Sequence, residues 1–375
     1  MALAGFKRHA ALPRLNHDEQ ARQAFVGQFR GHLSARVMPG NYRAYERRAA
    51  PRFLATEGRP PRDHRDVRRV MEQDGYYQFW SALQRRSQEL MWDAVIDPVE
   101  RQHGALNAYA NRQHRRGSLR LDPDLPLPRY QTAVDIHLQP GGYHSEFADG
   151  DAAAGAFYDQ ALYIYSNGAT GACNDAMGEL LLKFYREYFP ADRPSRLLEM
   201  GCGIGNSLLP WVAAFPGCET HGIDIGAPVL RYGHARAAAL GATVHFSQQN
   251  AERTDFAAAG FDLVISHLLL HETSRTAMPR IMAECHRLLR PGGVMLHLEI
   301  PRGDTPVEQF FYNWEAFNNN ETFAQFLTGV DLAPLAAAAG FDASRTRVVR
   351  YARPRSADQH LYGETFFWNV LIAKR

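Results

Sequence analysis

The sequence contains few cysteines and almost no lysine. Its four cysteines are Cys173, Cys202, Cys218 and Cys285. They are scattered without paired spacing, which indicates neither a disulfide framework nor a zinc knuckle and fits a reducing cytoplasm. Lysine occurs only at positions 7, 183 and 374. Nearly all basic residues are therefore arginine, which we interpret as coding bias rather than chemistry.

The chain also lacks an excess of charge and any long hydrophobic run. The formal net charge of its 375 residues is +2, which argues against a dedicated nucleic-acid or membrane-surface binder. No stretch is long enough to span a bilayer, and the N-terminus lacks the apolar core of a signal peptide. These features predict a cytoplasmic protein whose partners include neither nucleic acid nor membrane.

What the sequence does contain is a glycine-rich turn within residues 196–207. A short apolar run there ends in glycines at positions 201, 203 and 205. This pattern predicts a buried strand and a tight turn into a helix, where a ligand can approach the backbone closely. Because Glu199 brings a negative charge to the site, we expect a cation or a polyol there rather than a pyrophosphate.

This spacing differs from that of common nucleotide motifs. A dinucleotide fingerprint needs its third glycine where the chain has Asn206, and the P-loop sequence Gly-Lys-Ser/Thr is absent. The pattern acidic-x-Gly-x-Gly-x-Gly instead resembles the first motif of the Rossmann-like (class I) S-adenosylmethionine-dependent methyltransferases. Four more elements follow in the order and spacing of that family, over residues 220–225, 244–252, 261–267 and 287–299.

The resemblance implies a fold, a cofactor and a cofactor site. The fold would be α/β, a seven-stranded Rossmann-like sheet with an antiparallel last strand, and the cofactor would be S-adenosyl-L-methionine. Glu199 would lie near its amino-acid tail, Asp224 would bind the ribose hydroxyls, and Asn250 would lie at the adenine edge. The full cofactor set implied is Glu199, Gly201, Gly203, Gly205, Asp224, Ile225, Asn250, Ala251 and Ser266.

The length of the chain predicts two regions. Residues 1–150 would form a mainly helical region that acts as a lid, a substrate-binding surface or a dimerisation surface. Residues 151–375 would form the methyltransferase domain, with an inserted lid at about 302–329 and two final strands at 348–351 and 366–373. The apolar stripe of the first region is either core or a helix-packing surface between subunits, so a homodimer is possible.

Local patterns divide the N-terminal region further. A helix is expected from about residue 16 to residue 36, with Pro39 and Gly40 ending it, and residues 63–115 have a mostly helical pattern. The alternating stretch at 131–138 predicts a strand rather than a helix. Another helix is expected at 175–189, leading into the second region.

Aromatic and amide side chains mark a candidate substrate site. Tyr158, Tyr163 and Tyr165 precede the first strand, where the family commonly covers its cofactor; they form either the rim of the active site or the seam between the two regions. Trp314 and Asn318 lie in the insertion, where such groups would cover a small organic molecule beside a sulfonium cation. The asparagines there could equally be turn residues.

Two histidines are candidate catalytic residues. His267 and His271 follow the fourth strand, which in the family borders the methyl-transfer pocket, so either could remove a proton from the acceptor. The alternatives are that they pack near the cofactor and the helix, or that they bind zinc. Their order, His-x-x-x-His-Glu, is not that of a metalloprotease, and no third metal ligand stands out, so no metal is expected.

These observations predict a methyltransferase acting on a small molecule, in specialised metabolism. Two alternatives remain. One is an enzyme that uses the same cofactor for cyclisation or aminocarboxypropyl transfer, because the binding motifs would be identical. The other is a non-catalytic regulatory protein that binds the cofactor. The acceptor atom stays open among carbon, nitrogen, oxygen and sulfur, since function resides in the pocket rather than in the fold.

Overall fold

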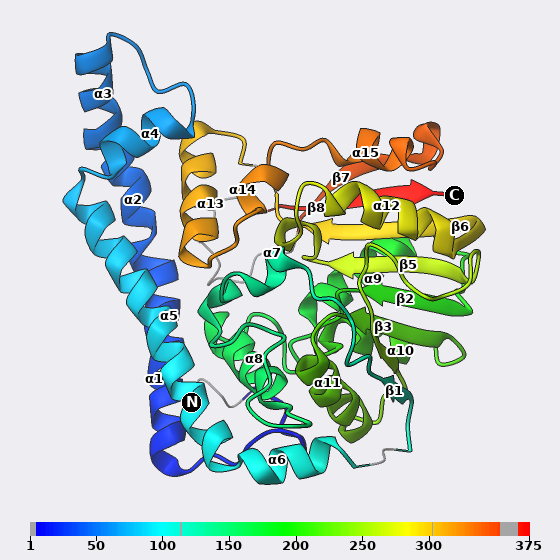
Figure 1. Cartoon of the computed structure of the whole chain (residues 1–375). Coiled ribbons are helices and arrows are strands. Elements are labelled where there is room, and N and C mark those ends of the chain that lie inside the picture. Colours follow the sequence, from blue (N-terminus) through cyan, green and yellow to red (C-terminus); the bar gives the residue numbers. More distant parts are fainter. Residues whose placement is uncertain (1–4, 113–114, 302, 353–366) are drawn as a thin grey trace.

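A mixed β-sheet organises the second half of the chain. The computed structural model describes residues 5–112, 115–301, 303–352 and 367–375. Within them the sheet has eight strands in the order β1-β4-β3-β2-β5-β6-β8-β7 (Figure 1). The strands are β1 Ser118–Arg120, β2 Arg196–Met200, β3 Glu219–Asp224, β4 His245–Gln248, β5 Phe261–His267, β6 Leu289–Glu299, β7 Arg347–Ala352 and β8 Phe367–Lys374.

Strand direction confirms the predicted α/β sheet. Strands β1 to β6 run parallel to one another, whereas β8 runs antiparallel to both β6 and β7. Strand β1, a three-residue edge strand from the N-terminal region that pairs with β4, was not predicted. Phe366, the expected start of the last strand, lies outside the described residues.

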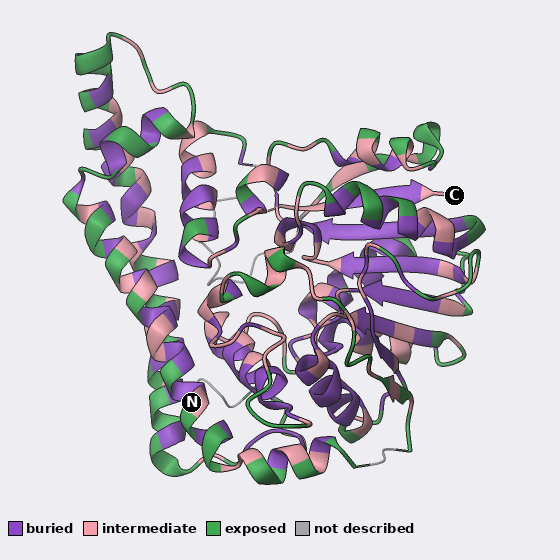
Figure 2. Ribbon diagram, viewed as in Figure 1, coloured by how far each residue is buried: buried purple, intermediate pink, exposed green. Residues whose placement is uncertain are grey.

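Both faces of the sheet are covered by helices. These are α9 Ala176–Tyr188, α10 Leu209–Ala214, α11 Ala227–Ala239, α12 Ala277–Leu288 and α15 Leu332–Ala338. Leu197 and Leu263 pack in one hydrophobic cluster with α9 and α10, and their neighbours Leu198 and Val264 pack in another with α12 and α15. This alternation is the period of two of a strand, and it leaves the inner strands buried (Figure 2).

The N-terminal region is helical, as predicted. Its helices are α1 His17–His32, α2 Pro39–Ala44, α3 Ala50–Glu57, α4 His64–Met71, α5 Gly75–Arg101 and α6 His103–Ala110. Asn16 and Glu19 form a capping box at the start of α1. The predicted end at Pro39 is wrong: a π-helical turn at Leu33–Val37 follows α1, and Pro39 begins α2. Proline fits there because a first helical residue needs no N–H.

Residues 131–138 do not form the predicted strand. They contain the end of α7 Arg129–Thr132 and a 3-10 turn at Ile136–Leu138. His137 and Leu138 have φ angles of 56° and 60°, which no strand residue adopts. The segment's polar backbone groups bind side chains and loops instead of a neighbouring strand.

A helical insertion follows β6 and meets the N-terminal helices. It contains α13 Pro306–Asn318 and α14 Ala324–Leu327; residue 302, the expected start of the lid, lies outside the described residues. Trp314 packs against Trp80 of α5, with ring centroids 4.2 Å apart. We call α1, α5, α8 (Ala153–Tyr165), the loop 133–144, α13 and α14 the cap.

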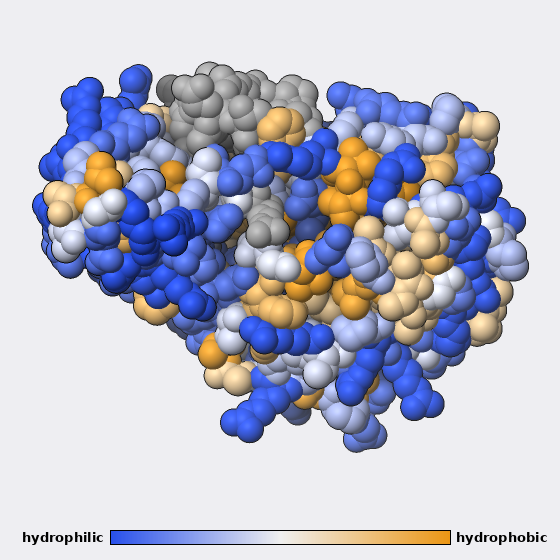
Figure 3. Space-filling view, turned by 90° about the horizontal axis from the view of Figure 1, so that it is seen from above, coloured by the Kyte–Doolittle hydropathy of each residue, from blue (hydrophilic) through white to orange (hydrophobic). Residues whose placement is uncertain are grey.

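Seen from above, hydrophilic side chains cover the outer margins of the molecule, and hydrophobic ones gather in patches nearer its middle (Figure 3). Among the described residues, no helix combines the length and the apolar character needed to cross a membrane.

Candidate functional site

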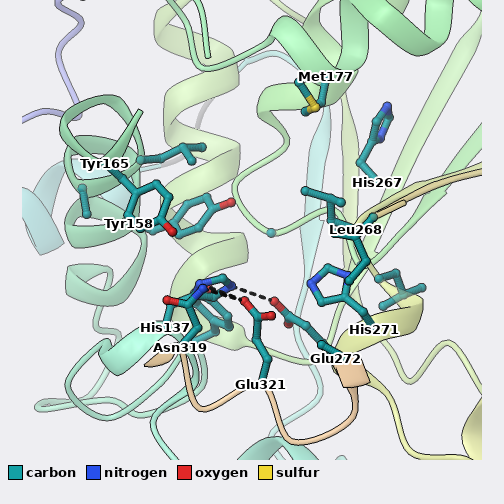
Figure 4. Close-up of a pocket in the computed structure, with 18 of the residues that line it drawn as sticks. His137, Tyr158, Tyr165, Met177, His267, Leu268, His271, Glu272, Asn319 and Glu321 are labelled. Atoms are coloured by element: carbon teal, nitrogen blue, oxygen red, sulfur yellow. Dashed lines mark hydrogen bonds and ion pairs between the residues drawn. The ribbon is translucent and has the colours of Figure 1, made fainter. Parts of the chain in front are cut away.

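A cavity of about 450 Å³ lies between the carboxyl ends of β2, β3, β4 and β5 and the cap. Part of it is shown in Figure 4. Residues from the glycine turn line one side of the cavity, and residues of α8, the loop 133–144 and the insertion line the other. Segments almost 340 residues apart in sequence, from Arg30 to Trp368, thus meet around one space.

The glycine turn forms one wall of this cavity. Gly201, Cys202 and Gly203 line it. Gly203 has a φ of 51°, and a Cβ added there would meet no atom within 4 Å, so its backbone faces open space. Gly205 does not line the cavity. Its φ is 69°, and an added Cβ would lie 2.7 Å from the ring of Phe246, so packing and conformation require a glycine there.

Asp224 lies at the end of β3 and lines the cavity beside this turn. Its carboxylate accepts hydrogen bonds of 2.9 Å from the N–H groups of Gly203 and Gly226. Burial nevertheless outweighs these bonds and raises the pKa of Asp224 to about 6. A ligand that donates further hydrogen bonds to this carboxylate would favour its ionised form.

Glu199 and His267 form a buried pair at the ends of β2 and β5. Glu199 Oε1 lies 2.6 Å from His267 Nδ1, and burial raises the pKa of Glu199 although the contact with His267 acts in the opposite direction. The other polar atoms of the pair, Glu199 Oε2 and His267 Nε2, have no hydrogen-bond partner among the described residues. Buried polar atoms usually have partners, so these two indicate a ligand-binding position.

The residues predicted to lie near the adenine of the cofactor also line the cavity. Ile225, Asn250 and Ala251 line it, and Asn250 Oδ1 accepts a hydrogen bond of 2.9 Å from the N–H of Glu252. Ser266 does not line the cavity: its hydroxyl contacts Nδ1 of the buried His297 instead. Seven of the nine predicted cofactor residues therefore surround this space.

Tyr158 and Tyr165 line the cavity, but the other predicted substrate residues lie elsewhere. Tyr163 faces away from the cavity and stacks on Phe6, with ring centroids 4.7 Å apart. Trp314 Nε1 donates to Ser81 Oγ, and Asn318 Nδ2 donates to Gln88 Oε1. These last two side chains join the insertion to α5, so they hold the cap together.

His137 of the cap was not among the predicted site residues. His137 lines the cavity between two carboxylates: its Nε2 lies 3.2 Å from Glu272 Oε1, and its Nδ1 lies 3.5 Å from Glu321 Oε1 (Figure 4). Burial lowers the pKa of His137, but these glutamates outweigh burial and raise it. In the sequence, Glu272 is marked only by its position next to His271, a candidate base, and His137 lies in the stretch predicted to be a strand.

His271 also lines the cavity and is bound to a buried glutamate. Its Nδ1 lies 3.0 Å from Glu299 Oε2. Burial lowers the pKa of His271, but the hydrogen bond and charge of Glu299 outweigh burial and raise the pKa to about 9. The imidazole is therefore charged at neutral pH.

This pair predicts a pH-dependent contribution to stability. The pKa of His271 in the folded protein lies above the unfolded value of about 6.5, so its stabilisation is complete below pH 6.5 and is lost as pH rises through 9. We expect His271→Gln to cost on the order of 2–3 kcal/mol more at pH 6 than at pH 10. Urea unfolding of both proteins across this range measures the difference; a pH-independent difference would contradict a charged pair.

The chain is similar to known methyltransferases. A family model for a methyltransferase domain matches residues 197–293. A malonyl-[acyl-carrier protein] O-methyltransferase of Enterobacter lignolyticus is 31% identical over 175 residues, 46% of this chain and 66% of the relative. A ubiquinone/menaquinone biosynthesis C-methyltransferase of Sinorhizobium fredii is 30% identical over 181 residues, 47% of this chain and 66% of the relative.

Solved structures are more distant. Phosphoethanolamine N-methyltransferase 2 of Haemonchus contortus is 18% identical with a TM-score of 0.41, covering 52% of this chain and 51% of that one. The chain thus spans 66% of the length of each curated relative and about half of this structure. The matched model covers β2 to β5 and the glycine turn, and the relatives are methyltransferases by name: the chain contains a class I S-adenosylmethionine-dependent methyltransferase domain.

Proposed function

We propose that this protein transfers a methyl group from S-adenosylmethionine to a small-molecule acceptor held under the cap. The observation that carries the proposal is that the predicted cofactor residues and the residues of the cap line the same cavity. Seven predicted cofactor residues line it together with tyrosines, histidines and glutamates of the cap and of the segment after β5. A volume of about 450 Å³ is in the range of small-molecule sites.

The residues present fit the cofactor. Its bound form supplies a methyl group already activated on a positively charged sulfur. The unpartnered Glu199 Oε2 would accept hydrogen bonds from the ammonium group of the amino-acid tail, and Asp224 would accept them from the ribose hydroxyls. The open space over Gly203 leaves room for a ligand against the backbone. The protein therefore needs to supply position, water exclusion and, for some acceptors, a base.

The two candidate catalytic histidines differ in their surroundings. His271 is charged at neutral pH because Glu299 raises its pKa to about 9, so we do not propose it as a base. His267 keeps Nε2 unbound at the edge of the cavity while Nδ1 contacts Glu199. Of the two, His267 is the candidate proton acceptor.

Two measurements test the proposed function. Titration calorimetry with S-adenosylhomocysteine should show saturable binding, because the product keeps the adenosine and amino-acid groups that Asp224 and Glu199 would hold. Incubation with methyl-labelled cofactor and small-molecule acceptors should then move the label to an acceptor. No heat of binding in well-folded protein would contradict the proposal. A product carrying an aminocarboxypropyl group instead, identified by mass spectrometry, would favour the alternative reaction.

A further inference from the structure

A segment of the N-terminal region follows the carboxyl edge of the sheet. We call residues 118–144 the roof segment. It begins with β1, which pairs with β4. The N–H of Asp122 then donates to Gln248 Oε1 over 3.0 Å, and Gln248 Nε2 donates to Ile225 O over 3.0 Å. Because Ile225 lines the cavity, the segment starts beside one of the predicted cofactor residues.

Tyr130 of this segment lies next to the predicted adenine position. It lines the cavity, and its hydroxyl donates to Glu252 Oε1 over 3.0 Å. Glu252 directly follows Asn250 and Ala251, which line the same cavity. Tyr130 also packs against the hydrophobic cluster that contains Ala251. The tyrosine is therefore held beside the residues that would contact the adenine.

Two contacts fix Tyr130 in this position. Glu252, which binds its hydroxyl, also pairs through Oε2 with Arg280 Nη1 at 3.0 Å. The ring of Tyr130 meets that of Phe323 in the insertion edge to face, with centroids 6.1 Å apart. Burial and the charge of Glu252 raise the pKa of Tyr130, so its hydroxyl remains a donor at neutral pH. A side chain that is fixed before a ligand arrives loses less conformational freedom on binding.

The later part of the roof segment reaches the predicted ribose position. Gln131 Nε2 donates to Glu272 O over 2.9 Å. A Cβ added at Gly226 would lie 2.5 Å from Tyr143 O, so the end of the segment packs directly on this glycine. The N–H of Gly226 in turn donates to Asp224, the predicted ribose ligand. The roof segment therefore runs from β4, past the predicted adenine position, to the neighbourhood of Asp224.

We propose that Tyr130 packs its ring against the adenine of S-adenosylmethionine, and that the roof segment covers the adenosine half of the cofactor. This inference rests on the proposed function, because it adds a contact to the same cofactor site. Every base has an aromatic face on which a side-chain ring can stack. Asn250 binds the edge of the base, and Tyr130 binds its face. Tyr130 lies outside the methyltransferase domain matched at residues 197–293, so the N-terminal region binds the cofactor directly.

Two variants separate the ring of Tyr130 from its hydroxyl. Tyr130→Ala removes both and should weaken binding of S-adenosylhomocysteine at least about tenfold, because stacking on the base is lost. Tyr130→Phe keeps the ring and should bind within about threefold of the wild type. Tyr188→Ala is the matched control and should leave the affinity unchanged, since Tyr188 stacks on Phe184 of α9 and does not line the cavity. Titration calorimetry measures all four proteins. Wild-type affinity in Tyr130→Ala overturns the proposal, and so do equal losses in the two Tyr130 variants.

A fragment of the cofactor locates the contact. 5′-Methylthioadenosine contains the adenine and the ribose but lacks the amino-acid tail that Glu199 would bind. Tyr130→Ala should weaken binding of this fragment by the same factor as binding of S-adenosylhomocysteine, as measured by displacement calorimetry. A loss of affinity confined to S-adenosylhomocysteine would place Tyr130 at the amino-acid tail and contradict the proposal.

Hydrogen exchange of the wild-type protein tests the covering of the adenosine without any substitution. Backbone amides of residues 129–139 should exchange more slowly when S-adenosylhomocysteine or 5′-methylthioadenosine is bound, because the ligand suppresses the local openings through which they exchange. Unchanged exchange of this segment in protein saturated with S-adenosylhomocysteine contradicts the proposal. Wild-type protein that does not bind S-adenosylhomocysteine at all would instead contradict the proposed function.

Discussion

Replacing Asp159 with alanine is expected to cost about 3–5 kcal/mol of unfolding free energy. Asp159 lies on α8 with no exposed surface. Its carboxylate contacts Arg236 Nε at 2.8 Å, the hydroxyl of Tyr232 at 2.9 Å and His9 Nε2 at 3.1 Å. The carboxylate thus joins α8 of the cap to α11 and to the N-terminal segment.

The cost arises mainly from the partner left behind. Arg236 is 1% exposed, so removing Asp159 leaves a guanidinium charge buried without its counterion. The same contacts hold the pKa of Asp159 well below its usual range, although burial alone would raise it. The ion pair therefore stabilises the protein above the unfolded pKa of about 3.9, and this contribution is lost as pH falls through the lower folded value.

Guanidinium chloride unfolding at pH 7 measures the prediction. Asp97→Ala is the matched control, because Asp97 pairs with Arg22 at the surface at 2.7 Å and should cost less than about 1 kcal/mol. A double replacement, Asp159→Leu with Arg236→Met, removes both charges and should recover much of the loss. Equal losses of unfolding free energy for Asp159→Ala and Asp97→Ala would contradict the prediction that breaking the buried pair is more costly than breaking a surface pair.

The parts of the site that follow local patterns could be predicted from the sequence. Glu199, Asp224 and the glycines lie at strand ends. A short apolar run that ends in an acidic residue or a glycine predicts such an end. In parallel strands these ends meet at one edge. The family resemblance supplied their roles, and the structure places Glu199 and Asp224 on one cavity.

The cap could not be predicted in the same way. His137 takes its conformation from Asn319, about 180 residues away, and from Gln88 and Trp92 on α5. No local pattern indicates such partners, so the alternating residues around it were interpreted as a strand.

The sequence could have predicted that Tyr163 lies on a different face of its helix from Tyr158 and Tyr165. Tyr158 and Tyr165 are seven residues apart and share one face of α8, whereas Tyr163 is turned about 140° from Tyr158 at 100° per residue. Treating 152–166 as a helix would have separated them. The structure shows this separation, since Tyr163 packs on Phe6 and the other two line the cavity.

Replacing Asp224 with alanine is expected to weaken binding of S-adenosylhomocysteine at least about 100-fold. A carboxylate that accepts hydrogen bonds from two ribose hydroxyls contributes about 1.5–3 kcal/mol for each, and about 2.7 kcal/mol corresponds to a factor of 100. Asp224 also accepts from the N–H groups of Gly203 and Gly226, so its loss loosens the glycine turn as well. Titration calorimetry at pH 7.5 measures the change.

Charge, shape and position can be separated for this residue. Asp224→Asn keeps the shape and one acceptor oxygen, so its loss of affinity should be smaller, about tenfold. Asp255→Ala should leave the affinity unchanged because Asp255 pairs with Arg120 outside the cavity.

Burial raises the pKa of Asp224 to about 6 in the free protein, and hydroxyl donors favour its ionised form. The wild-type affinity should therefore fall as pH drops below 6, by up to about tenfold per pH unit, and the Asn variant should lack this fall. Equal wild-type affinity at pH 5 and pH 7.5 would mean that Asp224 does not bind the ligand through its charge.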